Sequence, residues 1–558
     1  MIRTVIRYAA IAAVVGLGAC DLAVSNPNQP ETKRVLSSPT DVESLLGNYY
    51  KRWHSGMWAS LSNVQGMANV QSFEDYSSLS NNCMGQRVGI PRATNDNSIG
   101  NGCAAEQARV YFYMAEVNRV ASSILLTLNT APFTLGSTNQ DNRARSFAMF
   151  LRGVSLGYAA MFYDSAAVTD EKTDPVDPGK LAGYKDVALA SMDALQKAID
   201  FANTPGTGSA GFPLPSGWIP SSTSMTQAEF IKLIRTYRAR IRAGIARTPA
   251  ERAAIDWTAV IADAQNGITT DHDNITNTTT GPNNSWLNQF YAYGTWHQMA
   301  PFVIGMADNS GSYAQWIGTP LAQRGAGNTP FFMTTPDLRF PQGATRAAQQ
   351  ADFAITSCNA ASTPCKRYFV NRNQGNDVFS GNGYGFSNYD HARFWSWRTN
   401  GDGTSQNGKL IFFTLTELNM LEAEGQIVKG NYAAAAALIN KTRTKNGLPA
   451  ITALDNTTPV PGGADCVPKV PVGPSYTTIA CGNMMEALKY EKRIEEAYTG
   501  FAQWFVDMRG WGDLPEGTGY HWAVPYAELQ SRGYSPAQVY STGGGINSGS
   551  AVKGTYGW

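Results

Sequence analysis

Charged residues are scarce in this sequence, and neither sign predominates. They make up 16% of the 558 residues, and the formal net charge at pH 7 is +1. A nucleic-acid-binding surface needs a basic stripe that neutralises phosphates, so the composition argues against a nucleic-acid partner. Apolar residues make up 43% of the chain and aromatic residues 11%. That supply is enough for a large core, with aromatic surface to spare.

Long apolar runs are almost absent as well. One short run follows two arginines at the start of the chain, in MIRTVIRYAAIAAVVGLGAC. A membrane span needs roughly 20 apolar residues, so this run is typical of a secretory signal instead. Because its last residues, LGAC, resemble a bacterial lipobox, we expect residues 1–19 to be removed and Cys20 to be lipidated, which would anchor the chain to a membrane. The alternative is an ordinary cleaved signal that leaves Cys20 free.

No long linker divides the mature chain. Residues 20–40 are polar and contain three prolines, which predicts a flexible tether. We expect residues 41–558 to form one domain that is helical at 41–268 and 412–530. Between these parts, a loop-rich insertion is predicted at about 269–411, where Gly, Asn, Thr, Trp and Tyr replace helical periodicity.

Cysteines beyond Cys20 number six and fall into three local couples. Six cysteines allow 15 pairings, but each couple encloses a loop rich in Gly, Asn or Pro. Metal binding is the competing interpretation, yet no couple has the spacing of a zinc knuckle and no histidine lies at ligand spacing. We therefore expect no metal site and three disulfides, formed in an oxidising compartment: Cys83 with Cys103, Cys358 with Cys365, and Cys466 with Cys481.

Apolar residues recur at three- and four-residue steps in several segments, which predicts amphipathic helices. Thr40 and Glu43 have the spacing of a capping box at the start of the first one. Further helices are expected at 104–128, 142–163, 183–202, 225–247 and 256–267. A helix at 414–428, a turn at Lys429-Gly430-Asn431 and an Ala-rich helix at 432–445 have the outline of a tetratricopeptide-type unit.

The segment ALKYEKRIEEAYTGFAQWFVDMRGW, residues 487–511, is expected to be the last long helix. On a helical wheel, Glu491 and Glu495 border an apolar stripe, whereas Lys492 and Glu496 lie on the outer face. Two carboxylates four residues apart could be an acid/base pair. Neighbouring basic residues would keep both ionised and no histidine is adjacent, so a network of ion pairs fits better than catalysis.

Other patterns that carry chemistry are weak. The run GVSLG around Ser155 matches a nucleophile elbow, but it lies inside a periodic helix, where small residues suit packing. The five histidines form no metal-binding pair, and His391 is interpreted as a packed or surface residue.

Two loop runs place oxygen ligands at alternating positions, as calcium requires. Neither run has the glycine and distal glutamate of an EF-hand loop, so solvated turns are the favoured interpretation. The residues are Asp271 with Asp273, and Asn400 with Asp402.

The aromatic run SWLNQFYAYGTWHQ, residues 285–298, is the most suggestive loop segment. Flat aromatic rings cover the C–H face of a sugar while their polar tips bind hydroxyls. Core packing under a long loop explains the same residues, so both interpretations stay open. The ring-bearing residues are Trp286, Phe290, Tyr291, Tyr293, Trp296 and His297.

The segment YEKRIEEAYTGFAQWFVDMRGWGDL resembles the C-terminal signature of the SusD/RagB family of nutrient-uptake outer-membrane lipoproteins. The matching residues are Glu491, Arg493, Glu495, Gly500, Trp504, Asp507, Arg509 and Trp511. The resemblance covers nearly the whole chain, in the family's order: the lipobox at Cys20, NPNQP, DVESLLGNYYKRW, Tyr111 with Asn118 and Arg119, SFAMFLRGVSLGYAAMFYDSAAV, LTELNMLEAEGQIVKGNYAAAAALINKTRTKNGL, and Val524-Pro525 with Glu528-Leu529.

The resemblance implies a mostly α fold, a tetratricopeptide-like helical superhelix with a large irregular ligand-binding region. It implies a lipid-anchored protein of the outer membrane that faces outward, acts as a lid on a SusC-like TonB-dependent transporter and captures oligosaccharides or, in some members, peptides. It implies no enzymatic activity and no cofactor; a surface hydrolase is a weaker alternative. The family's ligand loops correspond to about 58–103 and 284–316, which makes these residues candidates by location: Tyr76, Arg87, Asn95, Trp286, Tyr291, Tyr293, Trp296 and Trp316.

Overall fold

Helices supply most of the regular structure of the protein, and the strands are short. The computed structural model describes residues 35–58, 64–74, 76–77, 84–93, 95–174, 177, 179–282, 297–325, 331–358, 365–373, 383–398, 407–534 and 549–558. Within these ranges, no helix combines the length and the apolar character that crossing a membrane would take. The mostly α prediction is confirmed, and Cys20 lies outside the described residues.

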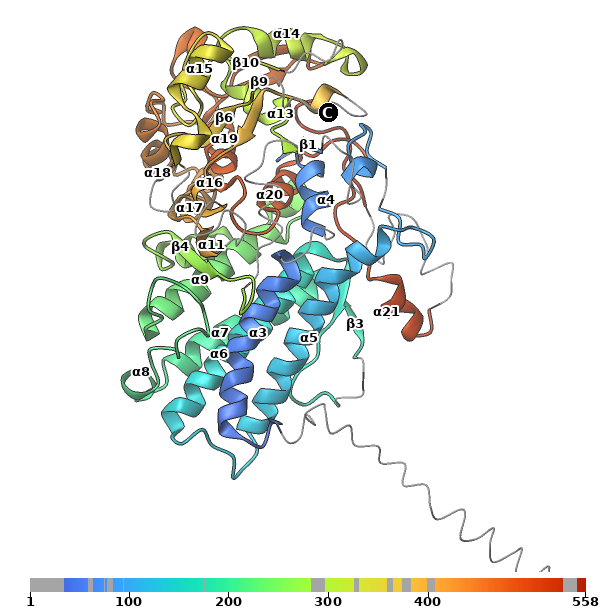
Figure 1. Cartoon of the computed structure of the whole chain (residues 1–558), viewed down its shortest axis with the longest axis vertical. Coiled ribbons are helices and arrows are strands. Elements are labelled where there is room, and N and C mark those ends of the chain that lie inside the picture. The colour runs from blue at the N-terminus through green and yellow to red at the C-terminus, as the bar shows by residue number, and fades with distance from the viewer. Residues whose placement is uncertain are drawn as a thin grey trace, which may run out of the picture.

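The N-terminal part is a set of long helices packed side by side (Figure 1). Their bounds agree with the predicted segments to within a few residues, because each carries an apolar stripe facing its neighbours. They are α3 Pro39–Trp58, α5 Ala104–Leu128, α6 Thr138–Phe162, α7 Tyr184–Ala202, α9 Gln227–Gly244 and α11 Trp257–Gln265, with shorter helices α4 Val64–Gln71, α8 Thr207–Ala210 and α10 Pro249–Ala253 between them.

The run GVSLG lies within α6, which is buried on nearly all sides. A Cβ on Gly153 would come within 2.5 Å of the Leu195 side chain of α7, and one on Gly157 within 2.4 Å of Ile241 of α9. The glycines therefore let three helices approach closely. Ser155 lies on a regular helix and not on a strained turn, as the packing interpretation requires.

The capping box predicted at the start of α3 is wrong. The helix begins two residues earlier than a cap at Thr40 would place it, at Pro39, and the backbone N–H of Asp41 donates to Ser38 Oγ at 3.3 Å. Serine before a proline at the first helical position is a favourable start. Glu43 instead forms an ion pair with Arg143 of α6.

The middle of the chain contains short elements in its described parts. The helices are α13 Pro301–Ile304, α14 Ser312–Gly318, α15 Arg346–Asp352 and α16 Trp395–Arg398. Over all the described ranges, the strands form five antiparallel two-stranded ladders: β1 Tyr76–Ser77 with β5 His297–Gln298, β2 Ser165–Ala167 with β3 Leu181–Gly183, β4 His272–Thr276 with β8 Gly408–Phe413, β6 Phe369–Asn371 with β7 Tyr389–His391, and β9 Lys469–Val472 with β10 Thr478–Cys481. Single 3-10 turns are η1 Met84–Arg87, η2 Gly305–Ala307, η3 Leu321–Gln323, η5 Ile355–Cys358, η7 Gly383–Gly385 and η8 Gly463–Asp465.

Two of the predicted cysteine pairs form disulfides in the described residues. Cys358 is bonded to Cys365, with their Cα atoms 5.0 Å apart, and Cys466 to Cys481, with their Cα atoms 5.8 Å apart. Cys83 lies outside the described residues, so its pairing with Cys103 stays a prediction.

The predicted tetratricopeptide-type unit is present as α17 Leu415–Val428 and α18 Tyr432–Lys445. The single long helix expected after it is wrong. The chain forms α19 Met484–Glu496 and α20 Gln503–Trp511, and the short α21 Tyr526–Ser531 follows. Between α19 and α20 the backbone adopts positive φ at Tyr498 (63°), Gly500 (61°) and Ala502 (51°), so the helix cannot continue through the segment.

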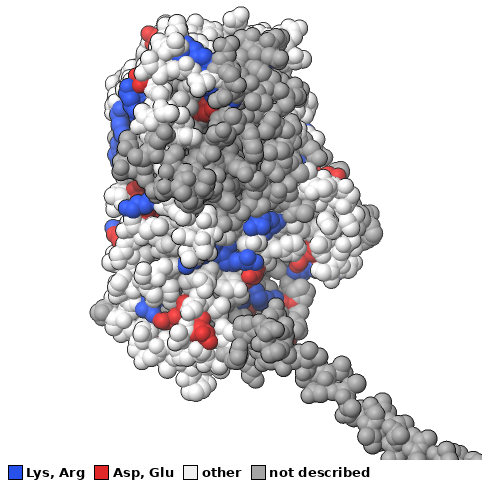
Figure 2. Space-filling view, viewed as in Figure 1, with Lys and Arg blue, Asp and Glu red and all other residues white. Residues whose placement is uncertain are grey.

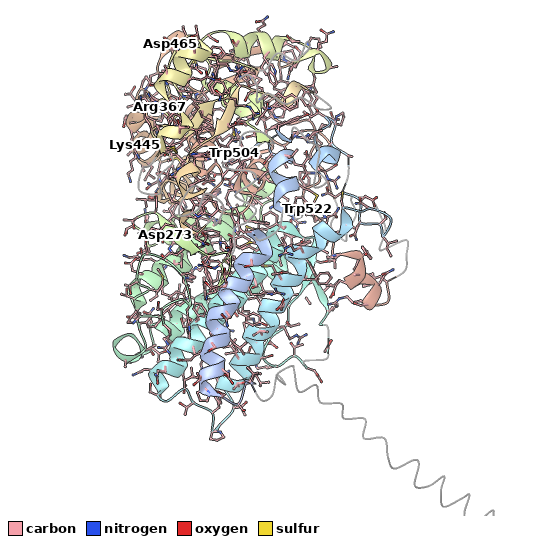
Figure 3. The ribbon with its side chains drawn as sticks, in the orientation of Figure 1. Asp273, Arg367, Lys445, Asp465, Trp504 and Trp522 are labelled. Atoms are coloured by element: carbon pink, nitrogen blue, oxygen red, sulfur yellow. A yellow bond between two sulfur atoms is a disulfide. The ribbon has the colours of Figure 1, made fainter. Side chains whose placement is uncertain are left out.

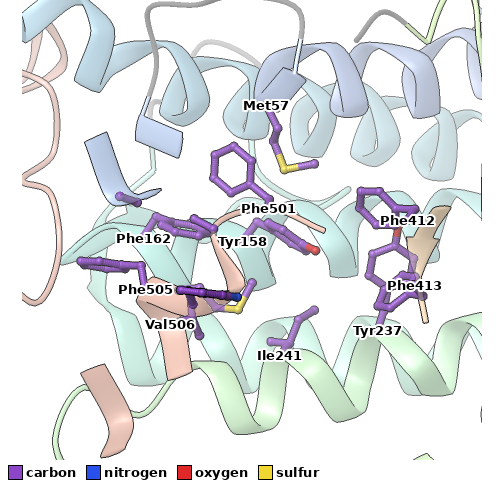
Figure 4. Close-up of a cluster of buried hydrophobic side chains, with 14 of the residues drawn as sticks. Met57, Tyr158, Phe162, Tyr237, Ile241, Phe412, Phe413, Phe501, Phe505 and Val506 are labelled. Carbon is purple, nitrogen blue, oxygen red and sulfur yellow. The ribbon is translucent and has the colours of Figure 1, made fainter. Parts of the chain in front are cut away.

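The turn between α19 and α20 places its aromatic residues in the centre of the core. Phe501 packs against Phe162 of α6, with ring centroids 4.8 Å apart. Figure 4 shows Tyr158 next to this pair, and Tyr237 and Phe412 farther along the same core. Trp504 of α20 also lies in the interior (Figure 3), where its Nε1–H donates to the backbone oxygen of Arg493 at 2.7 Å.

Candidate functional site

The ladder β1–β5 joins the two loop regions that the sequence nominates for ligand binding. Tyr76 pairs with Gln298, and Ser77 with His297, in antiparallel register. Tyr76 and Ser77 belong to the loop region after the first helix, whereas His297 and Gln298 end the aromatic run. The ladder therefore fixes the end of that run beside the earlier loop.

A buried aromatic cluster packs around Tyr76 of this ladder. Phe73 and Phe302 stack with centroids 3.9 Å apart, and Phe302 meets Trp316 edge to face at 4.8 Å. Tyr384 lies 6.1 Å from Phe302 and 6.0 Å from Tyr76. The aromatic cluster of Phe73, Tyr76, Phe302, Trp316 and Tyr384 thus links residues from three distant parts of the chain.

The four described ligand candidates are largely inside the protein. Tyr76 is 0% exposed, Arg87 2%, Asn95 3% and Trp316 9%. Asn95 Nδ2 donates to the backbone oxygen of His521 at 3.2 Å. These buried side chains therefore support the loops and do not present a contact surface for a ligand. They were candidates by their location in the sequence, and location does not tell whether a side chain points inward or outward. Trp286, Tyr291, Tyr293 and Trp296 lie outside the described residues.

Arg324 covers Trp316 at the edge of the aromatic cluster. Its guanidinium carbon is 4.3 Å from the ring centroid, and its Nε and Nη2 donate to the backbone oxygens of Thr319 and Ile317 at 2.9 and 3.0 Å. Burial lowers the pKa of Arg324 to about 10. Sequence reasoning missed this residue, because nothing in its spacing distinguishes it from other arginines.

The carboxylates of the 487–511 segment are ion-paired and buried, and they do not form an exposed acid/base pair. Arg339 Nη1 lies 2.9 Å from Glu491 Oε2 and 3.2 Å from Glu495 Oε1, while Asp337 holds its Nη2 at 2.7 Å. The prediction of a network is correct. The predicted outer-face position is wrong, because Lys492 and Glu496 are only 2% and 1% exposed.

A polar pocket of about 280 Å³ opens beside this network, between α17 and α18. Tyr368 donates its hydroxyl to Glu495 Oε2 at 3.0 Å, and Arg393 donates to the Glu495 backbone oxygen at 2.7 Å. Burial alone would raise the pKa of Glu495, but Arg339 and Arg393 hold it below its usual value. The carboxylate is therefore ionised and fully engaged, while Lys445 stands at the outer surface (Figure 3).

Of the two runs interpreted as solvated turns in preference to calcium sites, the described carboxylates, Asp271 and Asp273, accept hydrogen bonds from within the protein. Asp273 accepts from the Ser222 backbone N–H at 2.7 Å and from the Ser221 hydroxyl at 2.9 Å, and Asp271 accepts from the Leu415 N–H at 2.8 Å. Asn400 and Asp402 lie outside the described ranges. No group of three or more His, Cys, Asp or Glu side chains that could hold a metal occurs among the residues described.

His391 is packed and not available as a base. It is buried in β7, with its ring 4.7 Å from that of Tyr498. Burial holds the pKa of His391 well below its usual value. On the face shown in Figure 2, the acidic and basic side chains of the described residues are interspersed among uncharged ones.

The described residues form a mostly helical protein that includes the tetratricopeptide-type pair α17 and α18 and a ladder that joins two loop regions. No protein-family model matches the sequence. No curated protein matches it either. Solved structures that the chain resembles include proteins described as SusD superfamily, SusD-like and SusD/RagB family proteins.

Three of these structures illustrate the likeness. A SusD superfamily protein from Bacteroides fragilis has a TM-score of 0.49 and 13% identity, over 89% of this chain and 98% of that one. A SusD-like carbohydrate binding protein from Bacteroides vulgatus has a TM-score of 0.47 and 13% identity, over 85% of this chain and 83% of that one. A SusD/RagB family protein from Bacteroides thetaiotaomicron has a TM-score of 0.44 and 11% identity, over 84% of this chain and 86% of that one. The likeness extends over most of each chain, but the sequence identity and the TM-scores are low.

Proposed function

We propose that this protein is a non-enzymatic nutrient-binding protein that captures oligosaccharides on the loop face around the ladder β1–β5. The observation that carries the proposal is the pairing of Tyr76 with Gln298, which brings both nominated loop regions together. The aromatic run 285–298 ends in this ladder, and rings of that kind suit the C–H faces of sugars. The buried aromatic cluster beneath gives the face a rigid base.

Capture at a cell surface fits the start of the sequence. A lipidated Cys20 and a polar tether at 20–40 would hold the protein at the outer membrane, facing outward. The signature motif supports delivery of the bound sugar to a SusC-like TonB-dependent transporter. The role of the carboxylates as ion-pair partners supports a binding protein over a hydrolase.

The test is substitution of the loop aromatics. Trp286→Ala and Trp296→Ala are expected to weaken oligosaccharide binding by about 2- to 10-fold each, because a ring stacked on a sugar is worth about 0.5–1.5 kcal/mol. Isothermal titration calorimetry measures the affinity, and thermal denaturation checks that the variants stay folded. Phe112→Ala is the control, since this ring is 40% exposed on α5, outside the loop regions.

Unchanged binding in every aromatic variant would contradict the site assignment. Screening the protein against glycans and peptides in parallel separates the main alternative, because retention of peptides alone would identify a peptide-capture lipoprotein of the same fold. Turnover of a bound glycan would identify a hydrolase. Co-purification of the full-length protein with a transporter tests delivery.

A further inference from the structure

An apolar pocket of about 370 Å³ opens between α7, the end of α9 and the segment around α10. Ligand pockets in proteins typically enclose roughly 300–1,000 Å³ and combine an apolar lining with a few polar groups. This pocket has both properties, and it lies outside the loop regions assigned to oligosaccharide capture. Its larger apolar lining residues are Leu189, Met192, Ile241, Ile245 and Ile255.

Leu189 makes one wall of this pocket accessible to solvent. It is 69% exposed on α7, and Met192, Ile245 and Ile255 beside it are only partly buried. A single exposed leucine needs no explanation, but here it extends an apolar concave surface. An apolar molecule placed in the pocket would remove that surface from water, which favours the bound state.

Arg242 supplies a positive group at the edge of the same pocket. Its Nε lies 3.4 Å from Asp263 Oδ2, and its side chain is 24% exposed. Of its nitrogens only Nε is enclosed by the protein, so the terminal Nη1 and Nη2 are open to solvent, and neither donates to a described residue. Two free terminal nitrogens of a planar guanidinium match the two oxygens of a carboxylate.

The positive charge of Arg242 is incompletely compensated. Arg235, Arg238 and Arg242 lie on one face of α9, and all three pair with the single carboxylate of Asp263. Arg238 takes both of its oxygens, at 2.6 and 3.0 Å. Burial therefore lowers the pKa of Arg242, even though Asp263 opposes the shift.

The other charged groups of the pocket already have partners within the protein. Lys185 Nζ lies 3.0 Å from Glu251 Oε1, and Glu251 Oε2 accepts from the backbone N–H of Arg247 at 2.8 Å. Asp256 accepts from the backbone N–H of Ala259 at 3.1 Å, although its charge also acts on Arg242. The unused hydrogen-bonding capacity is thus that of a cation beside an apolar surface.

We propose that this pocket binds a small amphiphilic carboxylate, a molecule with an aliphatic body and one acidic head group. The carboxylate accepts hydrogen bonds from Nη1 and Nη2 of Arg242, and the aliphatic body lies on Leu189, Met192 and Ile245. The positive charge selects an acid over a neutral or basic amphiphile of the same size. The site is separate from the proposed oligosaccharide face and does not depend on it.

Isothermal titration calorimetry tests the pocket on the full mature chain carrying Cys20→Ser, in buffer without detergent. The probes are octanoate, octanol, octylammonium and acetate. Octanoate is expected to bind about 10-fold more tightly than octanol, the effect of hydrogen bonds to a charged group. Octylammonium and acetate should bind more weakly than octanoate, because the first is repelled by Arg242 and the second lacks an apolar body.

Arg242→Met is expected to weaken octanoate binding by about 10-fold and to leave octanol binding unchanged. The matched control is Arg235→Met. Arg235 stands on the same helix, pairs with the same Asp263 at 3.3 Å and is 30% exposed in its side chain, but it does not line the pocket. The control should leave both affinities unchanged, and thermal denaturation checks that the two variants stay folded.

Two further variants separate the apolar and the charged contributions. Leu189→Ser should weaken octanoate and octanol alike, by about 2- to 10-fold, because both lose apolar contact. Asp256→Asn keeps a good N-cap residue at the start of α11 but removes a negative charge from the pocket. It should strengthen octanoate binding by about 2- to 5-fold, the effect of one exposed charge, without changing that of octanol.

Three calorimetric results would overturn the proposal. The first is that octanoate does not bind saturably, or binds no more tightly than octanol. The second is equal octanoate affinity in Arg242→Met and Arg235→Met. The third is loss of octanoate binding in Trp296→Ala, which would place the acid on the loop face. A crystal soaked with octanoate is expected to show its carboxylate beside Arg242, and water alone there would count against the site.

Discussion

Arg509 is buried without a carboxylate partner among the described residues. It donates instead to four backbone oxygens, those of Met161, Gly244, Ala246 and Tyr520, at 2.6–3.2 Å. The first three lie at or just beyond the C-terminal ends of α6 and α9, where carbonyls lack intrahelical donors. Burial, together with the charge of Arg247, lowers the pKa of Arg509 to about 9.

We expect Arg509→Met to destabilise the protein by about 3 kcal/mol or more, because several buried carbonyls lose their donor. Urea denaturation measures the change. Arg52→Met is the control, since its ion pair with Glu116 is exposed and such pairs are worth less than about 1 kcal/mol. Similar losses in both variants would contradict the role of Arg509.

Glu495 and Glu496 are sequence neighbours whose environments differ in kind. Glu495 accepts from Thr442, Tyr368 and Asn446. Neither oxygen of Glu496 has a hydrogen-bond partner in the described structure, and Lys492 lies 3.7 Å from Glu496 but 2.7 Å from Asp507. Burial therefore raises the pKa of Glu496 well above its usual value of 4.5, despite Lys492.

The two residues should respond oppositely to pH. Folded Glu496 retains a proton that the unfolded chain loses, so its contribution to stability falls as pH rises above the pKa of the unfolded chain. Between about pH 5 and pH 8, the free energy of unfolding of Glu496→Gln should therefore rise relative to that of the wild type. Glu495 has a lowered pKa, so its contribution is present above the unfolded pKa and is lost in acid.

Glu495→Gln should therefore cost about 1.5–3 kcal/mol near neutral pH, the value of hydrogen bonds to a charged group, and less in acid. Urea denaturation of both variants across this range measures the difference. Parallel pH dependence in the two would show that their environments are equivalent.

Sequence reasoning reached the chemistry of these residues but not their burial. The excess of basic neighbours around Glu491 and Glu495 predicted ion pairs over catalysis. It could not show that Lys492 and Glu496 face the interior. Lys492 pairs with Asp507, which lies across a turn, and Asp507 is also paired with Arg252, which lies far away in the chain. Only the folded chain brings such partners together.

Between α19 and α20, three residues hold the left-handed backbone conformation, and only one of them is glycine. A Cβ on Gly500 would lie 2.8 Å from an Arg240 guanidinium nitrogen. That guanidinium pairs with both oxygens of Glu417 at 2.6 Å. The turn is thus constrained both by its backbone and by a buried ion pair.

Substitutions at the two ends of this turn should have opposite signs. Gly500→Ala is expected to destabilise the protein by more than about 1–2 kcal/mol, since the left-handed cost adds to the clash with Arg240. Ala502→Gly removes the same cost and should stabilise by up to about 1 kcal/mol. Chemical denaturation measures both; a loss in Ala502→Gly would mean that its methyl group contributes more by packing.

At the scale of elements, isolated amphipathic helices were predictable and the broken one was not. The helix at 104–128 coincides with α5, and that at 432–445 with α18, because each buries one stripe. The segment 487–511 buries side chains on every side, including Ala497, Tyr498 and Phe501 in the turn. An apolar period that continues through a buried turn carries no signal of where the helix ends.

Across the whole molecule, segments far apart in sequence close the candidate site. Trp558 packs on Phe302, with centroids 5.0 Å apart, and on Phe73, at 5.9 Å. The family resemblance nominated two loop regions, and the ladder β1–β5 joins them, but the sequence does not tell which rings turn inward. Tyr76 and Trp316 lie in the supporting cluster because ring orientation depends on contacts with distant residues.

The proposed membrane attachment would depend on one atom, the thiol sulfur of Cys20. Cys20→Ser removes the thiol that would carry the acyl chains, so the variant should leave the membrane pellet and appear in the soluble fraction. Fractionation with immunodetection measures this, and Cys358→Ser serves as a control that changes another cysteine. A Cys20→Ser protein that still pellets would contradict the lipid anchor.

The contacts of Arg509 also bear on the order of synthesis. Its acceptors Gly244 and Met161 precede it by 265 and 348 residues. While a ribosome is still producing the middle of the chain, α6 and α9 lack the donor that completes their ends. A chain cut short before residue 509 lacks this donor, so we expect its N-terminal helices to be less stable and to be cleaved by proteases more readily than in the full chain.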